Sequence, residues 1–348
     1  MASDLKNSTI LMITPFHKNP RGNKLTSERL QTGLRQRGWA IDLLSLESDD
    51  WQYILGRALQ EKRYDLIHGL NITYFSRVLS VFPDMAQLPL LLTTTGTDVN
   101  YDIQSGSKPG ITATLNTVKY IVIFDDYFRA VFQRLYPDQA AKLITIPQGV
   151  SLEKNAGPGR SQLGLKDNDF VFILPSGLRP VKNLEFAIDA LEKLQPEFSD
   201  LRLLILGAVI DREYSDSIQK RIQSLPWVIY PGEFPHDQMY TMMARADVVL
   251  NTSHSEGQPQ AALEAMSLGK PCLLTAVPGN LNIIENGREG YYVRNQADMT
   301  AAARTLITNR RLCRQMGENA RRLVARKYSL PQELNAYEAI YQELLAGN

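Results

Sequence analysis

The sequence has few cysteines, no long apolar run and no marked excess of either charge. Its two cysteines, Cys272 and Cys313, exclude a disulfide framework in a chain of 348 residues and favour a reducing, cytoplasmic setting. The first apolar run, residues 10–13, is too short for a signal peptide or a membrane span. A formal net charge of +1 gives no electrostatic reason to expect a nucleic-acid partner.

Motifs of other nucleotide-binding proteins are also missing. No G-x-G-x-x-G follows an apolar run, which argues against a dinucleotide-dependent dehydrogenase. No G-x-x-x-x-G-K-[ST] occurs, which excludes a P-loop ATPase. The one D-x-D, Asp167-Asn168-Asp169, lies in a polar stretch where a turn is expected. The sequence therefore predicts neither a bound metal nor a cofactor.

Short apolar runs alternate with segments of helical periodicity along most of the chain. This alternation predicts an α/β fold in which parallel sheets are covered by helices on both faces. A polar stretch at residues 151–169 is typical of a linker, and the alternation starts again after it. Because the length also favours two domains, we predict two Rossmann-like halves, residues 1–150 and 151–330, with a central cleft between them.

The most informative stretch runs from residue 251 to residue 269. An apolar run leads into a polar turn, Pro259 stands at the expected first position of a helix, and Gly269 ends that helix. Such a turn presents free backbone N–H groups to an anion. Glu256 and Glu264 flank it with seven residues between them. Carboxylates at these positions could accept hydrogen bonds from the hydroxyls of a ribose and of a sugar attached to the two ends of a diphosphate. The plainer alternative, two solvated acids, is less favoured in this strand–turn–helix context.

This E-x7-E arrangement resembles the signature of retaining GT-B glycosyltransferases of group 1 (family 4). Residues 177–183 are similar to a small subgroup, the glycosyltransferase 1 domain-containing proteins. The resemblance implies a GT-B fold with an acceptor-side domain at 1–150, a donor domain at 151–330 and a final helix, 331–348, that completes the first domain. It also implies metal-independent transfer of a sugar from a nucleotide-diphosphate donor to a hydroxyl acceptor, with retention at the anomeric carbon.

The resemblance assigns roles to individual residues. Glu256 would hold the donor sugar, Glu264 the ribose hydroxyls, and Arg179 and Lys182 the diphosphate. Further donor contacts are expected from Gly177, Gly257, Gln258, Pro259 and Gln260, from Gly22 and Asn23 in a glycine loop of the first domain, and from Phe234 against the nucleobase. For the basic pair, simple exposure on a loop is an equally weighted alternative.

Residues 93–98 resemble the family's His-Gly-Thr/Ser-Asp element, but Thr95 stands where many members carry His. Asp98 is therefore the acid/base candidate, or else it caps the segment that follows. The missing His keeps a second hypothesis open, a relative that binds a nucleotide sugar without transferring it. A third is a nucleotide-sugar epimerase of the same fold. His17 and His254 are expected in packing or turns.

Basic residues cluster near the end of the second domain. They are Arg310, Arg311, Arg314, Arg321, Arg322, Arg326 and Lys327. A solvated helix face is the favoured interpretation, and a weak contact with anionic lipid, as in some relatives of the family, is the alternative. The nucleobase, the sugar, the acceptor and the oligomeric state are left open by the sequence.

Overall fold

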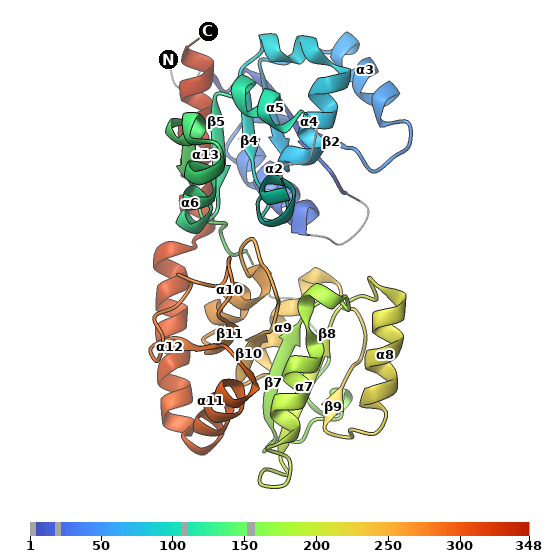
Figure 1. Ribbon diagram of the computed structural model, residues 1–348, viewed down its shortest axis with the longest axis vertical. Helices are drawn as coiled ribbons and strands as arrows, with labels where there is room; N and C mark the ends of the chain where they lie inside the picture. The colour runs from blue at the N-terminus through green and yellow to red at the C-terminus, as the bar shows by residue number, and fades with distance from the viewer. Residues whose placement is uncertain (1–4, 18–21, 106–109, 152–156, 348) are drawn as a thin grey trace. The chain divides into compact units, whose positions relative to one another are not determined.

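The chain forms two compact units in a computed structural model that describes residues 5–17, 22–105, 110–151 and 157–347. Unit 1 consists of residues 1–149 and 330–348, and unit 2 consists of residues 150–329. Each unit is a six-stranded parallel sheet covered by helices (Figure 1). The predicted α/β class is confirmed. The boundaries lie within one residue of the expected ones, whereas the acceptor and donor roles of the two units stay predictions.

Unit 1 is built on a sheet in which chain order and spatial order differ at one point. Its strands, in sheet order, are β2 (Ala40–Ser45), β1 (Thr9–Thr14), β3 (Leu66–Leu70), β4 (Leu90–Thr93), β5 (Tyr120–Ile123) and β6 (Leu143–Thr145). The chain runs outward from β1 to β2 and then returns to place β3 on the other side of β1. The switch point of this sheet therefore lies between the carboxyl ends of β1 and β3.

Helices cover both faces of that sheet. They are α2 (Gly22–Gln36), α3 (Trp51–Glu61), α4 (Ile72–Val81), α5 (Ile111–Thr117), α6 (Asp126–Leu135) and α13 (Leu330–Ala346), with the short turns η1 (Pro83–Gln87), η2 (Asp98–Ile103) and η3 (Pro137–Lys142). Strands such as β1 are apolar and buried along almost their whole length, as strands covered on both faces must be. One buried cluster joins the sheet to α3–α6, and a second joins it to α2 and α13.

The last helix, α13, is fixed to unit 1 by buried polar groups as well as by apolar packing. His68 on β3 contacts the hydroxyl of Tyr341 at 2.7 Å and that of Thr93 at 2.8 Å, and Thr93 also contacts the hydroxyl of Tyr337 at 3.1 Å. The Arg29 guanidinium of α2 donates to both carboxylate oxygens of Glu333, at 2.9 and 2.8 Å. A fully paired buried network of this kind holds one arrangement, because any displacement would leave polar groups unsatisfied.

Unit 2 repeats the same architecture. Its strands, in sheet order, are β12 (Gly290–Val293), β11 (Cys272–Thr275), β10 (Val248–Asn251), β7 (Phe170–Pro175), β8 (Leu201–Leu206) and β9 (Val228–Ile229). The switch point lies between β7 and β10, because β8 and β9 extend from one side of β7 and the later strands from the other. The helices are α7 (Leu184–Glu192), α8 (Arg212–Ile222), α9 (Met239–Ala244), α10 (Gln260–Ser267), α11 (Gln296–Thr308) and α12 (Arg310–Lys327), with the short turns η4 (Ser161–Leu163), η5 (Pro180–Lys182) and η6 (His236–Gln238).

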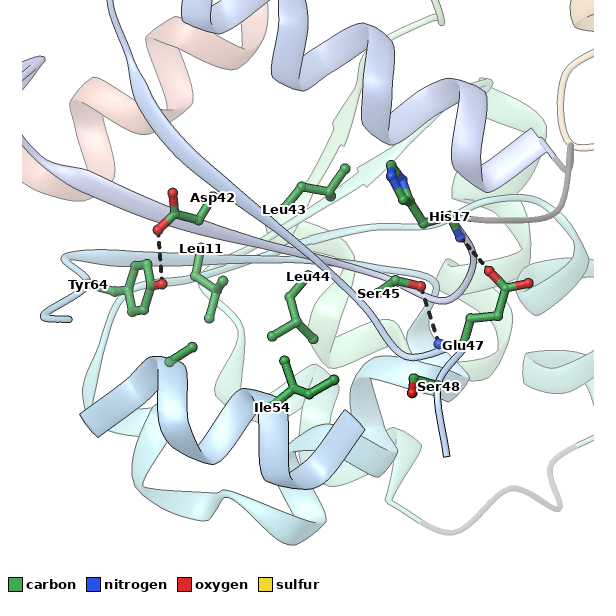
Figure 2. Close-up of a pocket in the computed structure, with 11 residues that line it drawn as sticks. Leu11, His17, Asp42, Leu43, Leu44, Ser45, Glu47, Ser48, Ile54 and Tyr64 are labelled. Atoms are coloured by element: carbon green, nitrogen blue, oxygen red, sulfur yellow. Dashed lines mark hydrogen bonds between the residues drawn. The ribbon is translucent and has the colours of Figure 1, made fainter. Parts of the chain in front are cut away.

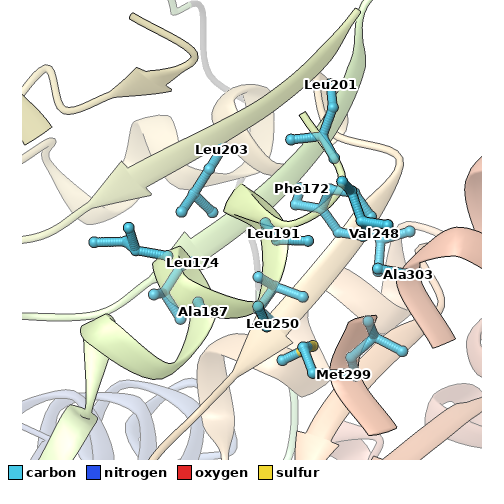
Figure 3. Close-up of a cluster of buried hydrophobic side chains, with 14 of the residues drawn as sticks. Phe172, Leu174, Ala187, Leu191, Leu201, Leu203, Val248, Leu250, Met299 and Ala303 are labelled. Carbon is cyan, nitrogen blue, oxygen red and sulfur yellow. The ribbon is translucent and has the colours of Figure 1, made fainter. Parts of the chain in front are cut away.

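The largest core of unit 2 lies between its sheet and two of its helices. Figure 3 shows Phe172, Leu203 and Leu250 of the strands facing Leu191 of α7 and Met299 of α11. The other face of the sheet is buried against α9, α10 and α12. Both faces are thus closed, which leaves the strand ends as the places where polar groups can meet a ligand.

One detail of the sequence prediction needs correction. Pro259 has φ −77° and ψ 71° and precedes α10 as its N-cap, so it does not occupy the first helical position. The helix ends at Ser267, with Leu268 as its C-cap, and Gly269 follows at φ +76°, which is the closing position predicted for it. Within the described residues, no helix has both the length and the apolar character needed to span a bilayer. Cys272 and Cys313 are buried free thiols.

Buried His68 makes a prediction about stability and pH. Burial lowers its pKa to about 3, so between pH 6.5 and 3 the unfolded chain binds a proton that the folded chain does not, and stability falls as pH falls. The free energy of unfolding of unit 1 should drop by about 2 kcal/mol from this residue between pH 7 and pH 5. The change His68→Gln should remove that part of the pH dependence, whereas His17→Gln, at an exposed position, should keep it. Denaturant titration at several pH values measures this in a Trp227→Phe background, where only the tryptophans of unit 1 report. If the free energy of unfolding changed equally with pH in the wild type and in His68→Gln, the prediction would be contradicted.

Candidate functional site

Two loops meet at the switch point of unit 2. One follows β7 (residues 176–183) and the other follows β10 (residues 252–259), and the two strands pair in parallel through Val248 and Phe172. The backbone N–H of His254 donates to the carbonyl of Val181 at 2.9 Å, and the Thr252 hydroxyl donates to the carbonyl of Lys182 at 2.9 Å. These bonds hold together two segments that are about seventy residues apart in the chain.

An ion pair between Lys182 and Glu256 lies at the centre of these loops. The ammonium nitrogen of Lys182 is 2.6 Å from Oε1 of Glu256, and the same oxygen accepts from the Ser253 hydroxyl at 2.6 Å and from the Asn251 amide at 3.0 Å. Burial alone would raise the pKa of Glu256, but the Lys182 charge and these bonds outweigh it and lower the pKa. The pair is therefore charged at neutral pH, and both side chains are mostly shielded from water.

The segment after β11 supports Glu256 from behind. Glu256 donates its backbone N–H to the carbonyl of Pro278 at 3.2 Å. Gly279 has φ +84°, and a Cβ there would lie 2.1 Å from the carbonyl oxygen of Glu256, so only glycine fits. The buried amide of Asn280 donates to the Asn251 side chain at 3.2 Å. The carboxylate of Glu256 is thus held in position by its surroundings before any ligand binds.

Groups that attract anions gather beside the pair. Arg179 is exposed, and its guanidinium makes no hydrogen bond or ion pair with the residues that the structure describes. The backbone N–H groups of Gly257, Ala261 and Ala262, at and just before the start of α10, likewise have no acceptor in the described parts of the chain. The positive end of the helix dipole adds to them. A diphosphate is the kind of ligand that this arrangement suits.

The second glutamate faces a different loop. Glu264, on α10, is 5% exposed, and its Oε1 lies 3.8 Å from Nε2 of His236 in the segment after β9. Phe234 of the same segment is half-buried and packs on the core. Gln258 is buried, and its amide donates to the side chain of Gln260 at 3.4 Å. The structure therefore places Glu256 beside the loop of Lys182 and Glu264 beside the loop of Phe234.

Glycines allow the strand ends of unit 2 to come close together. A Cβ on Gly177 would lie 2.4 Å from Cδ1 of Ile210, which is itself 43% exposed. A Cβ on Gly207 would lie 2.1 Å from the carbonyl oxygen of Ser176. The space beside Gly177 is thus filled by the side chain of Ile210, and the donor contact expected at Gly177 stays a prediction.

In unit 1 the predicted residues lie on separate elements. Gly22 and Asn23 begin α2, and a Cβ on Gly22 would meet no atom within 4 Å; Pro20 and Arg21 of the expected glycine loop lie outside the described residues. Asp98 is fully buried and accepts from the backbone N–H groups of Ile72, Thr95 and Val99 at 2.9, 2.9 and 3.1 Å. Asp98 thus ties the turn after β4 to the start of α4, and the N-cap of the segment that follows is Thr97. The acid/base role of Asp98 stays a prediction.

The pKa of Asp98 follows from this environment. Burial raises it to about 6, although the three backbone hydrogen bonds act in the opposite direction. The charge of Asp102 raises it further. A carboxyl group that titrates in this range can exchange a proton near neutral pH.

Unit 1 also contains a cavity that the sequence analysis did not predict. It lies between β2 and α3, has a volume of about 480 Å³ and is lined at its base by Leu11, Leu44 and Ile54 (Figure 2). One end includes Ser45 and Glu47 at the carboxyl end of β2. None of the predicted site residues lines it. Asp42 and Tyr64 line the opposite end, so the cavity has an apolar middle and polar groups at both ends.

The acidic triplet in the sequence proves to be a structural turn. Asp169 is buried, accepts from the backbone N–H of Lys166 at 2.7 Å and lies 3.3 Å from the Arg202 guanidinium. Across the described ranges, no cluster of three His, Cys, Asp or Glu side chains is placed to hold a metal ion. The sequence prediction of a metal-free site remains a prediction.

Several groups at the site were not predicted from the sequence. Asn251, Ser253 and Asn280 orient Glu256, and the sequence analysis gave none of the three a role. The available signal was positional, because Asn251 and Ser253 come where the apolar run of β10 ends, and the ends of parallel strands carry function.

The two-unit fold is found in solved glycosyltransferase structures. Anabaena HepE in complex with UDP and glucose superposes with a TM-score of 0.79 at 18% identity, covering 97% of this chain and 100% of that one. Sucrose-phosphate synthase from Thermosynechococcus elongatus gives a TM-score of 0.81 at 17% identity, with coverages of 98% and 100%. At this level of identity the likeness concerns the fold alone. The fold is that of the GT-B glycosyltransferases, as predicted.

Sequence comparisons give the family. Residues 159–323, most of unit 2, match the family described as glycosyl transferases group 1. The chain is 24% identical to glycosyltransferase 1 domain-containing protein 1 of Xenopus tropicalis, over 93% of this chain and 94% of the relative. It is 25% identical to N-acetyl-alpha-D-glucosaminyl L-malate synthase of Bacillus anthracis, over 74% and 69%. Unit 2 therefore matches the group 1 glycosyltransferases, and the resemblance stated from the sequence is confirmed.

The Lys182–Glu256 pair makes a prediction about the stability of unit 2. Lys182→Ala should lower the free energy of unfolding by about 1–3 kcal/mol, because it leaves a shielded carboxylate without its main partner. Arg322→Ala breaks a pair with Glu318 whose side chains are 76% and 62% exposed, and it should change stability by less than about 0.5 kcal/mol. Chemical denaturation measures both, with the fluorescence of Trp227 separated from that of the other tryptophans by comparison with Trp227→Phe. Equal, small effects of the two changes would show that the pair is not shielded as described.

Proposed function

We propose that this glycosyltransferase moves a sugar from a nucleotide-diphosphate donor to a hydroxyl acceptor, with retention of the anomeric configuration and without a bound metal. The single observation that carries the proposal is the Lys182–Glu256 pair at the switch point of unit 2. Arg179 and the free backbone N–H groups at the start of α10 lie in the same two loops. Together they provide a place for a diphosphate with a hydroxyl-binding carboxylate beside it.

Different residues would bind different parts of the donor. Arg179, Lys182 and the backbone from Gly257 to Gln260 would hold the diphosphate. Glu256 would accept hydrogen bonds from hydroxyls of the transferred sugar, because its carboxylate lies beside the groups that would hold the diphosphate. Glu264 would accept from the ribose hydroxyls on the other side.

Phe234 would lie against the nucleobase, since it belongs to the segment that Glu264 faces. Two similar proteins support the class of donor. The structure of HepE is a complex with UDP and glucose, which supports a nucleotide sugar. The Bacillus anthracis relative is an N-acetyl-alpha-D-glucosaminyl L-malate synthase, which supports a sugar as the transferred group.

In the proposed reaction the bond between the anomeric carbon and the diphosphate oxygen breaks as the acceptor oxygen bonds to the same carbon. The acceptor proton passes to the departing phosphate, so attack occurs on the face from which that group leaves. Negative charge grows on the diphosphate during this step. Preorganised positive groups directed at that charge supply the main catalytic effect.

The acceptor is assigned to unit 1, as the family resemblance implies. The cavity between β2 and α3 supports this assignment, because one of its two polar ends, with Ser45 and Glu47, lies at the carboxyl end of β2 and its base is apolar. The chemistry of the lining favours an acceptor that carries an apolar part as well as a hydroxyl group.

The two glutamates should separate nucleotide binding from transfer. Glu264→Ala removes the ribose contacts and should weaken the binding of free UDP, GDP or ADP, whichever binds the wild type, by about 10- to 100-fold. Glu256→Ala should leave free nucleotide affinity close to that of the wild type while transfer is lost, because its proposed partner is the sugar. Calorimetric titration together with a nucleotide-release assay measures both, and unchanged nucleotide affinity in Glu264→Ala would remove that residue from the site.

The positive groups, in place of a metal, should neutralise the leaving group. We expect EDTA to leave turnover largely intact and Arg179→Ala to reduce kcat by about 10²–10³. Arg311→Ala, at an exposed arginine of α12, is the matched control and should have no effect. Activity that disappears with EDTA and returns with Mg²⁺ or Mn²⁺ would refute the metal-free mechanism. Anomeric proton couplings of the product, measured by NMR, would show whether the configuration is retained.

A further inference from the structure

A second polar cluster lies at the carboxyl ends of β3 and β4 in unit 1, and the proposed reaction makes no use of its central pair. Asn71 directly follows β3, and Thr95 lies just beyond β4. Because β3 borders the switch point of the unit 1 sheet, this is where an open α/β sheet presents residues to a ligand.

The backbone of Asn71 is in a conformation that side chains rarely adopt. It has φ 66° and ψ 115°, and the residue is 5% exposed. Such a conformation persists where the surroundings hold it, and it is concentrated at functional sites. Here the side-chain oxygen accepts from the backbone N–H groups of Thr73 and Tyr74 at 3.2 and 3.4 Å, and the backbone N–H of Asn71 donates to Thr93 at 2.9 Å.

These contacts decide which way the Thr95 hydroxyl points. Because the Asn71 oxygen faces the two N–H groups of α4, its amide nitrogen must face Thr95, and that nitrogen lies 2.9 Å from the hydroxyl oxygen. An amide nitrogen only donates, so the Thr95 oxygen accepts and its own proton is directed elsewhere. Among the described residues no acceptor receives it. Thr95 is half-exposed, whereas Asp98 uses its oxygens on backbone N–H groups.

We propose that Thr95 is a substrate-contact residue whose outward hydroxyl proton donates a hydrogen bond to a hydroxyl oxygen of a sugar substrate, and that Asn71 is the positioning residue that sets this polarity. The inference rests on the proposed function, since it names a contact made during that reaction. The sugar hydroxyl belongs to the donor or to the acceptor, and the chemistry of recognition is the same for both.

Reversing the polarity of one hydrogen bond tests this inference. Asn71→Asp keeps the size of the side chain, its tolerance of a positive φ and its two bonds to the start of α4. It replaces the only donor by an acceptor, so the Thr95 proton turns inward. Thr95→Val removes the hydroxyl at nearly constant size, and Thr95→Ser restores it. Thr117→Val, at an exposed threonine of α5, is the matched control.

Turnover is measured as nucleotide release from UDP-glucose, UDP-N-acetylglucosamine, GDP-mannose and ADP-glucose, with and without free glucose, galactose and N-acetylglucosamine. Asn71→Asp and Thr95→Val should each lower kcat/KM by about 10- to 100-fold, and the double variant should lose no more than either alone. Thr95→Ser should recover most of the loss. Thermal unfolding and UDP affinity should stay close to those of the wild type, which separates the effect from a structural role.

Two arms distinguish the sources of the sugar hydroxyl. If release falls equally without an added sugar, the contact is to the donor, and if it falls only with one, the contact is to the acceptor. Wild-type rates in Asn71→Asp, or additive losses in the double variant, would overturn the inference while leaving the proposed function in place. If the wild type releases nucleotide from none of the four donors, the proposed function fails and the inference fails with it.

Discussion

The ion pair between Lys182 and Glu256 is the interaction on which the site in unit 2 depends. It joins the loop after β7 to the loop after β10, and these are the two strands on either side of the switch point. The carboxylate is held from behind by Asn280 and the close approach at Gly279. A charged pair shielded in this way is costly unless every oxygen has a partner. Lys182, Ser253 and Asn251 supply such partners to one oxygen of the Glu256 carboxylate.

Unit 1 uses a comparable arrangement with different chemistry. The carboxyl ends of β3 and β4 carry Asn71, Thr95 and Asp98. Here a buried carboxylate fixes the backbone and an amide sets the direction of a hydroxyl. These groups are neutral or internally satisfied, so they suit the orientation of a hydroxylated substrate and not the binding of a phosphate. Unit 2 thus carries the charged groups proposed for the diphosphate, and unit 1 carries the neutral groups proposed for a hydroxylated substrate.

Much of the fold could be predicted from the sequence, because local patterns of apolar residues indicate its strands and helices. Apolar runs of strand length alternate with helical periodicity, and the acids Glu256 and Glu264 stand in a recognisable motif. The contact between Lys182 and Glu256 could not be predicted, because it depends on the sheet order that makes β10 the neighbour of β7. The positive φ of Asn71 could not be predicted either, because asparagine adopts a positive φ only somewhat more often than other residues do. Pro259 was placed one position too far into its helix because a proline at the N-cap and one in the first turn look alike in sequence.

The most direct test of the central claim is a crystal structure of the protein with bound UDP. The account predicts that oxygens of the terminal phosphate lie within about 3 Å of the Arg179 guanidinium, the Lys182 ammonium and the N–H groups at the start of α10. The ribose hydroxyls should then contact Glu264, and Glu256 should remain beside the phosphate end. A nucleotide bound elsewhere in unit 2, with Lys182 in contact with Glu256 alone, would contradict the account.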